Sequence, residues 1–89
     1  MTTIRFTGNL KRHVDCPSDT VAGDTLAEAL SDYFSRHPAV KSYILDDQDV
    51  VRKHMLIMID GVNIQDRTSL SDHVKTSTTI DVFQALSGG

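Results

Sequence analysis

The sequence predicts an α+β fold, in which a mixed β-sheet carries one main helix packed across one face. Three observations support this fold class. Alternating apolar and polar residues indicate strands near both ends of the chain, at 4–6 and 78–83. One segment between them, 26–34, has its apolar residues at helical spacing. The chain has 89 residues, so we expect a single domain spanning residues 1–89.

The N-terminal region has the pattern of a β-hairpin. Residues 4–6 alternate between apolar and polar side chains, and Gly8-Asn9 suits a turn because both residues tolerate positive φ angles. A second alternating run, 13–16, follows and ends before Pro17. We therefore expect two antiparallel strands joined at Gly8-Asn9.

The clearest helix signal begins at Thr25. Thr25 and Glu28 have the spacing of a capping box, in which both residues satisfy N–H groups at the helix start. Pro38 ends the helix, because the residue before a proline is kept away from helical angles. The apolar stripe of this helix has to pack on a sheet, and it consists of Leu26, Ala29, Leu30, Tyr33 and Phe34.

Further strands are expected in the second half of the chain. Residues 43–45 fit a short edge strand. Residues 55–59 are apolar on both faces, which favours a central strand. Asp60-Gly61 is a strong hairpin signal, and residues 62–64 return from that turn.

The last part of the chain completes the predicted sheet. Residues 69–74 fit a short helical turn that starts at a capping hydroxyl, and residues 78–83 fit the last strand. A compact arrangement places the first and last strands side by side and parallel at the sheet centre, with a right-handed crossover between them. This order of elements is that of the β-grasp fold.

Composition excludes several classes of function. The formal net charge is -3, and the nine Lys and Arg residues are scattered, so the basic footprint of a nucleic-acid-binding protein is missing. The longest apolar stretch, 55–59, is too short to span a membrane, and the first residues do not resemble a signal peptide. We therefore expect a cytoplasmic protein.

The residues that most often carry chemistry have plainer expected roles here. Cys16 is the only cysteine, and we expect it to pack in the core rather than to act as a nucleophile. The four histidines lack the spacing of metal ligands, so no metal site is expected.

The chain closes with Gly88-Gly89, a few residues after the last predicted strand. This ending resembles that of the ubiquitin-like sulfur carriers, as do the helix start at 23–26 and the hairpin region at 60–64. These carriers include the small subunit of molybdopterin synthase and the sulfur carriers of thiamine and cysteine biosynthesis. The chain departs from them at 76–79, where they usually have an acidic-glycine turn, and at Gln84, near which they often have proline.

The resemblance implies a chemical role for the terminal carboxylate. A ubiquitin-activating-type adenylyltransferase would adenylate Gly89 with ATP, and a sulfur donor of the cysteine desulfurase or rhodanese type would convert the adenylate to a thiocarboxylate. A sulfur-accepting enzyme would then take the sulfur. Gly88 and Gly89 lack a Cβ and therefore suit a narrow channel. The carrier would have no catalytic residue and no bound cofactor of its own, because it is a co-substrate of its partners rather than an enzyme.

Partner contacts are expected on a flexible C-terminal tail, about residues 84–89, and at the end of the last strand. Leu86 and Ser87 lie on the tail, where contact with a partner is favoured. Phe83 alternates with the core-facing positions of the last strand, which fits either a docking anchor or a residue packed under a loop.

The strand at 55–59 offers a second candidate. Met58, together with Leu56, could extend the same docking surface, and methionine suits adaptable contacts. Core packing is nevertheless the expected role of each.

Two other kinds of function stay open. The chain could be the small subunit of a molybdopterin-synthase-like complex, with its tail inside a larger catalytic partner. It could also be a ubiquitin-like modifier joined to lysines through Gly89, or a β-grasp interaction domain without terminal chemistry. A carrier gains sulfur at its terminus, a modifier appears attached to other proteins, and an interaction domain binds equally well without Gly88 and Gly89.

Overall fold

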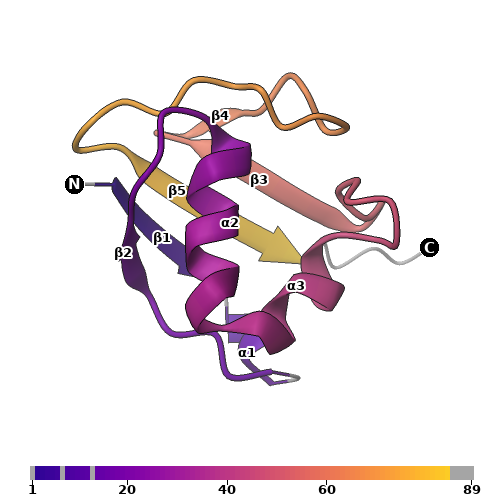
Figure 1. Cartoon of the computed structure of the whole chain (residues 1–89). Coiled ribbons are helices and arrows are strands. Elements are labelled where there is room, and N and C mark those ends of the chain that lie inside the picture. Colours follow the sequence, from indigo (N-terminus) through magenta and orange to yellow (C-terminus); the bar gives the residue numbers. More distant parts are fainter. Residues whose placement is uncertain (1, 7, 13, 85–89) are drawn as a thin grey trace.

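A five-stranded mixed sheet with helix α2 across one face forms the framework of the computed structural model (Figure 1). The structure describes residues 2–6, 8–12 and 14–84. The strand order in the sheet is β2-β1-β5-β3-β4. The strands are β1 (Thr2–Phe6), β2 (Asp19–Val21), β3 (Met55–Ile59), β4 (Val62–Asn63) and β5 (Thr79–Gln84), and the helices are α1 (Gly8–Lys11), α2 (Leu26–Arg36) and α3 (Pro38–Ile44).

The centre of the sheet is the parallel pair of β1 and β5. Ile4 lies beside Ile80, and Phe6 lies beside Val82. β3 pairs antiparallel with the other side of β5 and has β4 as its second neighbour, so it is an interior strand. Parallel neighbours need a crossover connection, and α2 lies within it. The predicted parallel pair at the sheet centre is confirmed.

The core lies between the sheet and α2. Strands send alternate side chains to opposite faces, and one face of this sheet meets the helix. All five residues of the predicted helix stripe are buried. The buried strand residues that meet them include Ile4, Phe6, Met55, Ile57, Ile80 and Val82. Tyr33 stands in this core with its ring centroid 5.1 Å from that of Phe6, and its hydroxyl donates to the Pro17 carbonyl at 2.7 Å.

The start of α2 has the capping arrangement that the sequence predicts. The Thr25 hydroxyl oxygen accepts a hydrogen bond from the Glu28 N–H at 3.3 Å, and the Glu28 carboxylate accepts one from the Asp24 N–H at 2.7 Å. Gly23 precedes them with a φ of 147°, and a Cβ there would lie 2.7 Å from the Glu28 Cβ. Glycine is therefore required where the chain enters the helix.

The predicted N-terminal hairpin is wrong in its turn and in its second strand. Helix α1 begins at Gly8, where the sequence predicts a two-residue turn, and β2 begins at Asp19, after the predicted run 13–16. Leu10 and Cys16 explain the difference, because both are buried in the core and draw this segment away from the sheet ladder. Pro17 also lacks the N–H that a ladder needs, and the β-branched residues that favour a strand follow it.

Residues 43–44 belong to helix α3, so the predicted edge strand at 43–45 is wrong. Pro38 follows the end of α2 and occupies the start of α3, where its missing N–H and fixed φ are favourable. Val40 and Ile44 lie one helical turn apart and are both fully buried. Burial at this spacing outweighs the β-propensity of the segment.

Residues 69–74 follow an irregular path rather than the predicted helical turn. Leu70 has a left-handed backbone with a φ of 56°, and its carbonyl accepts a hydrogen bond from the Ala27 N–H at 2.9 Å. The Asp72 carbonyl accepts one from the Leu26 N–H at 2.9 Å. These carbonyls satisfy N–H groups that have no partner within the first turn of α2. Capping of α2 therefore determines the path of this segment.

The predicted hairpin turn at Asp60-Gly61 is confirmed. Both residues have positive φ angles, 50° and 82°, as the tight turn between β3 and β4 requires. Val62 pairs with Ile59 across the hairpin, and the Ile64 N–H continues the ladder beyond the end of β4 with a hydrogen bond of 3.1 Å to the Ile57 carbonyl.

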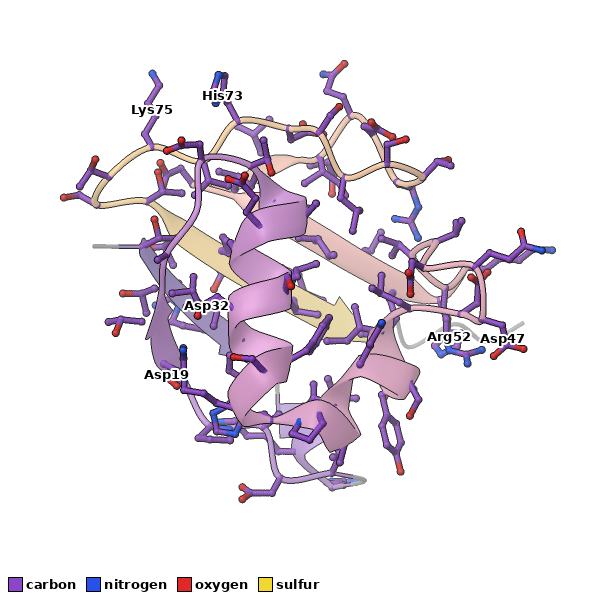
Figure 2. The ribbon with its side chains drawn as sticks, in the orientation of Figure 1. Asp19, Asp32, Asp47, Arg52, His73 and Lys75 are labelled. Carbon is purple, nitrogen blue, oxygen red and sulfur yellow. The ribbon has the colours of Figure 1, made fainter. Side chains whose placement is uncertain are left out.

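The edge strand β2 is closed by polar side chains of α2. Asp32 accepts a hydrogen bond from the Ala22 N–H at 3.0 Å, and Arg36 donates one to the Thr20 carbonyl at 2.8 Å. Arg36 also forms ion pairs with Asp32 at 3.0 Å and with Asp19 at 3.2 Å. Figure 2 shows Asp32 on α2 and Asp19 beside it at the start of β2. Backbone groups that would otherwise accept a further strand are occupied. A partner is therefore not expected to extend the sheet at this edge.

Candidate functional site

The candidate site is the sheet face that points away from α2, together with the end of β5. On β5, Ile80 and Val82 face the core, so Asp81 and Phe83 point to the opposite face. On β3, Met55 and Ile57 face the core, so Leu56 and Met58 point to the same opposite face. We call this surface the open face.

Three apolar side chains gather on the open face. Leu56 of β3 lies directly opposite Phe83 of β5, and Met58 follows Leu56 on the same side of β3. Directly opposite side chains in an antiparallel pair lie about 4.5–5.5 Å apart at their Cβ atoms, so these residues form one surface. We call Leu56, Met58 and Phe83 the apolar patch. Leu56 is 37% exposed, and the other two are half-buried.

The patch corrects one expectation from the sequence. Core packing is the predicted role of Leu56 and Met58, and it is wrong for both, since neither belongs to the buried core. The apolar run at 55–59 has an apolar residue on both faces of the sheet because one face packs on α2 and the other carries the patch. For Phe83 the sequence left two roles open, and the structure places it on the open face beside Leu56.

An ion pair borders the patch. Arg5 of β1 and Asp81 of β5 are direct neighbours in the parallel register, and Asp81 lies opposite Met58 on its other side. The guanidinium donates two hydrogen bonds to the carboxylate, from Nε at 2.8 Å and from Nη2 at 3.1 Å. The hydrogen bonds that Arg5 donates to Asp81, and then the negative charge of Asp81, raise the pKa of Arg5 above its ordinary value. The open face thus has an apolar part and a fixed polar border, which sequence alternation alone did not single out.

The segment that carries the candidate reactive carboxylate follows the end of β5 in the sequence. β5 extends through Gln84, which lies opposite Met55, the first residue of β3. The sheet therefore reaches the first residue of the segment predicted as a tail. Leu86, Ser87, Gly88 and Gly89 lie outside the described residues, so their predicted roles stay predictions.

The described residues offer no competing catalytic arrangement. Cys16 is buried, and burial raises the pKa of its thiol, which disfavours the reactive thiolate. Within the described ranges, the His, Cys, Asp and Glu side chains form no group of three or more that could hold a metal ion. Across the same part of the chain, no helix has the length and apolar character needed to cross a membrane.

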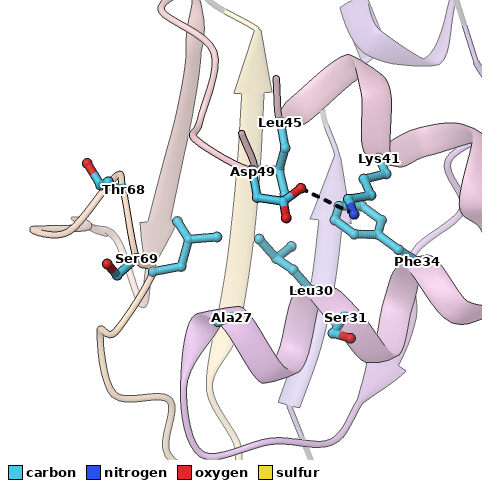
Figure 3. Close-up of a pocket in the computed structure, with 10 residues that line it drawn as sticks. Ala27, Leu30, Ser31, Phe34, Lys41, Leu45, Asp49, Thr68 and Ser69 are labelled. Carbon is cyan, nitrogen blue, oxygen red and sulfur yellow. Dashed lines mark ion pairs between the residues drawn. The ribbon is translucent and has the colours of Figure 1, made fainter. Parts of the chain in front are cut away.

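A groove of about 340 Å³ lies on the helix side of the molecule, between α2, α3 and the turn at 67–70 (Figure 3). Leu30, Phe34 and Leu45 contribute apolar side chains to it. At its rim, Lys41 Nζ pairs with an Asp49 carboxylate oxygen at 3.2 Å. It has the lining of an apolar surface groove and lacks convergent groups for acid–base chemistry.

Comparison with known proteins finds solved structures that have a similar fold. No protein-family model matches the sequence, and no curated protein matches it significantly. Among solved structures, the chain is similar to a chain of the Amycolatopsis orientalis BexX/CysO complex, with a TM-score of 0.82, 22% identity and 100% of both chains covered.

Two further structures agree with this likeness. SAMP1 from Haloferax volcanii has a TM-score of 0.77 at 21% identity, with 99% of this chain and 98% of that chain covered. CysO from Mycobacterium tuberculosis has a TM-score of 0.80 at 16% identity, with 97% of this chain and 100% of that chain covered.

These likenesses show that the chain has the ubiquitin-like β-grasp fold, and the predicted fold class is confirmed. The resemblance seen in the sequence is therefore borne out at the level of the fold.

Proposed function

We propose that the chain is a sulfur carrier whose Gly89 carboxylate is charged by a partner enzyme. The observation that carries this proposal is the course of β5, which is parallel to β1 at the sheet centre and ends five residues before Gly89. A rigid strand flanked by two others is a firm base for a terminus that another protein must find. The neighbouring carriers and modifiers with the same fold support this reading.

The proposed chemistry needs an activated carboxylate, because a free carboxylate is a poor electrophile. A ubiquitin-activating-type adenylyltransferase joins Gly89 to AMP and releases pyrophosphate from ATP. The terminal sulfur of a persulfide, held by a desulfurase- or rhodanese-type donor, displaces AMP, and a thiol then cleaves the S–S bond to leave a thiocarboxylate. A sulfur-accepting enzyme consumes that group. All of these steps belong to partner proteins and fit a cytoplasmic setting with ATP.

The reach of the terminus suits this scheme. Gln84 is the last residue of β5, and five residues follow it in the sequence. Extended chain advances about 3.3–3.6 Å per residue, so Gly89 can reach about 17 Å beyond the sheet. That length allows the domain to stay outside a partner while its carboxylate enters the partner's active site. Gly88 and Gly89 allow close passage because neither has a Cβ.

The apolar patch is the proposed docking surface. Phe83 is the second-to-last residue of β5, and the terminal segment follows this strand in the sequence, so a partner that holds Phe83 also fixes where that segment begins. Aromatic residues are frequent anchors of protein interfaces, and Leu56 and Met58 widen the contact. Leu86 and Ser87 add contacts along the segment that enters the partner.

Pyrophosphate release on incubation with ATP and the adenylyltransferase of the same organism tests this proposal. The wild-type chain supports release, whereas deletion of Gly89 abolishes it. Addition of one alanine after Gly89 also abolishes release, because that chain keeps both glycines but displaces the carboxylate. Lys75→Ala, at an exposed residue, serves as the control with unchanged release. Equal release from the Gly89 deletion would contradict the proposal.

A conjugating modifier is the second candidate, and its support is the likeness to SAMP1, whose name stands for small archaeal modifier protein 1. Both functions share adenylation and diverge afterwards. A modifier forms an amide between Gly89 and a lysine of another protein, so tagged chain would appear in denatured, higher-mass species. A carrier stays free and gains sulfur in place of oxygen.

A complex subunit is the third candidate, and its support is the neighbouring structure of CysO with BexX. A subunit of a molybdopterin-synthase-like complex would co-purify with its larger partner at fixed stoichiometry. A free carrier would bind its partners only transiently, so size-exclusion chromatography of the native complex separates the two functions.

A further inference from the structure

Strand β3 carries two methionines that differ in their access to solvent. Met55 and Met58 are three positions apart, so their side chains point to opposite faces of the sheet. Met55 is 0% exposed in the core, whereas Met58 is half-buried on the open face. A small reagent in solution can therefore approach Met58 in the folded protein, while Met55 is protected.

The neighbours of Met58 on the open face are polar. In the antiparallel registers, Met58 lies opposite Asp81 of β5 on one side and opposite Asn63 of β4 on the other. Both oxygens of the Asp81 carboxylate accept hydrogen bonds from Arg5, and Asn63 is exposed. An oxygen added to the sulfur of Met58 would therefore meet water and polar groups rather than the core, and the free domain would tolerate it.

The same oxygen would be unfavourable in a docked complex. Methionine is a flexible apolar side chain, and its sulfoxide is polar, which disrupts interfaces that depend on methionine. A partner that covers the apolar patch would have to remove water from the new S=O group, and a polar group buried without a hydrogen bond costs free energy. Oxidation of Met58 would therefore weaken docking without unfolding the domain.

We propose that Met58 is an oxidation site on the docking surface, at which hydrogen peroxide lowers the affinity of the carrier for its activating enzyme. This inference rests on the proposed carrier function. The sulfur attacks one oxygen of the peroxide, an S–O bond forms as the O–O bond breaks, and water leaves after proton transfer. Sulfur loses two electrons and the peroxide gains them. Methionine sulfoxide reductases reverse the change, so docking is restored when the oxidant is gone.

The first part of the test locates the oxidation. The folded wild-type chain is treated with hydrogen peroxide, catalase removes the peroxide, and fragmentation assigns each added oxygen. We expect one oxygen on Met58 and none on Met55, whereas treatment in urea adds oxygen to both. Cys16 is buried and Met1 lies outside the described residues, so fragmentation counts any oxygen on these two separately.

The second part measures docking by pyrophosphate release with the organism's own ubiquitin-activating-type adenylyltransferase. Oxidation of the wild-type chain should raise KM about tenfold, as burial of one unpaired polar group predicts, and leave kcat nearly unchanged. Treatment with the reductases should restore KM. Met58→Leu keeps an apolar side chain without sulfur, so its KM should not respond to peroxide. Met55→Leu is the matched control on the other face of β3, and its KM should rise as in the wild type.

Three results would overturn the inference. Oxidation of Met58 no faster than that of Met55 in the folded chain means that the open face gives no selectivity. An unchanged KM after oxidation of Met58 means that the partner does not contact this residue. A rise in KM together with a large fall in the urea unfolding midpoint means that the oxygen damages the domain itself. Absence of pyrophosphate release from the untreated wild-type chain is instead a failure of the carrier function, and it appears before any oxidation.

Discussion

At the scale of single residues, the polar loops are held by a few carboxylates. Asp66 is the clearest case, since it accepts hydrogen bonds from the Ser71 hydroxyl at 2.6 Å and from the N–H groups of Ser69 at 2.8 Å and Thr68 at 3.1 Å. The Ser71 hydroxyl bond, and then the backbone bonds, lower the pKa of Asp66 from 3.8 to about 2. Asp72 holds the same loop by accepting hydrogen bonds from the N–H groups of Gln65 and Asp66, so the path of the chain between β4 and β5 depends on both carboxylates.

The lowered pKa of Asp66 predicts how stability depends on pH. Its contribution to the free energy of unfolding is complete above the ordinary pKa of 3.8 and is lost as the pH falls toward about 2. Urea unfolding measured between about pH 5 and pH 2 should show this decline. Asp66→Asn, which cannot titrate, should show a smaller decline over the same range. The exposed Asp47→Asn serves as the control, and a decline equal to wild type in Asp66→Asn would contradict the assignment.

At the scale of elements, two adjacent residues of β3 have different roles, one in the core and one in the proposed docking surface. Ile57 is 1% exposed and faces α2, whereas Leu56 is 37% exposed and faces the open face. The two side chains are of equal size and differ in which surface they join. The strand therefore contributes to the core with one face and to the proposed docking surface with the other.

This geometry predicts opposite outcomes for two alanine variants of β3. Ile57→Ala should lower the free energy of unfolding by about 2–5 kcal/mol, because it leaves a cavity in the core. Leu56→Ala should lower it by less than about 1 kcal/mol. Leu56→Ala should instead raise KM for the adenylyltransferase, because it removes part of the apolar patch. Urea unfolding and pyrophosphate release measure the two effects, and a Leu56→Ala protein with wild-type KM would exclude this residue from the docking surface.

The elements also show what the sequence could predict and what it could not. Helix α2 was predictable because its apolar stripe and its Thr25–Glu28 cap agree on the same bounds. Helix α3 is harder to predict, because Pro38 marks the end of one helix, and its second role at the start of the next helix depends on burial of Val40 and Ile44. The shift of β2 to Asp19–Val21 depends on burial of Leu10 and Cys16, a tertiary effect that local alternation does not contain.

The candidate site was predictable in part for the same reason. Alternation on β5 placed Phe83 opposite the core face, because a strand has a period of two. The match of Leu56 with Phe83, and of Arg5 with Asp81, depends on the register between strands far apart in the sequence. A single sequence does not give that register.

At the scale of the whole molecule, the packed domain of sheet and helix α2 is distinct from the proposed reactive residue, Gly89. The parallel pair of β1 and β5 forms the centre of this domain, and the core between the sheet and α2 stabilises the domain. Ion pairs at the surface join residues one helical turn apart, as Arg36 does with Asp32, and residues on strands far apart in the sequence, as Arg5 does with Asp81. Under the proposed function, partner choice depends on the open face, and the chemistry depends on Gly89.

The most direct test of this account is the intact mass of the chain after incubation with ATP, the adenylyltransferase and a persulfide sulfur donor. The account predicts a mass increase equal to sulfur replacing one oxygen, located at Gly89 by fragmentation, and absent from the chain that lacks Gly89. An unmodified wild-type chain under conditions in which the same enzymes charge their known carrier would contradict it, as would the same mass increase in the chain without Gly89.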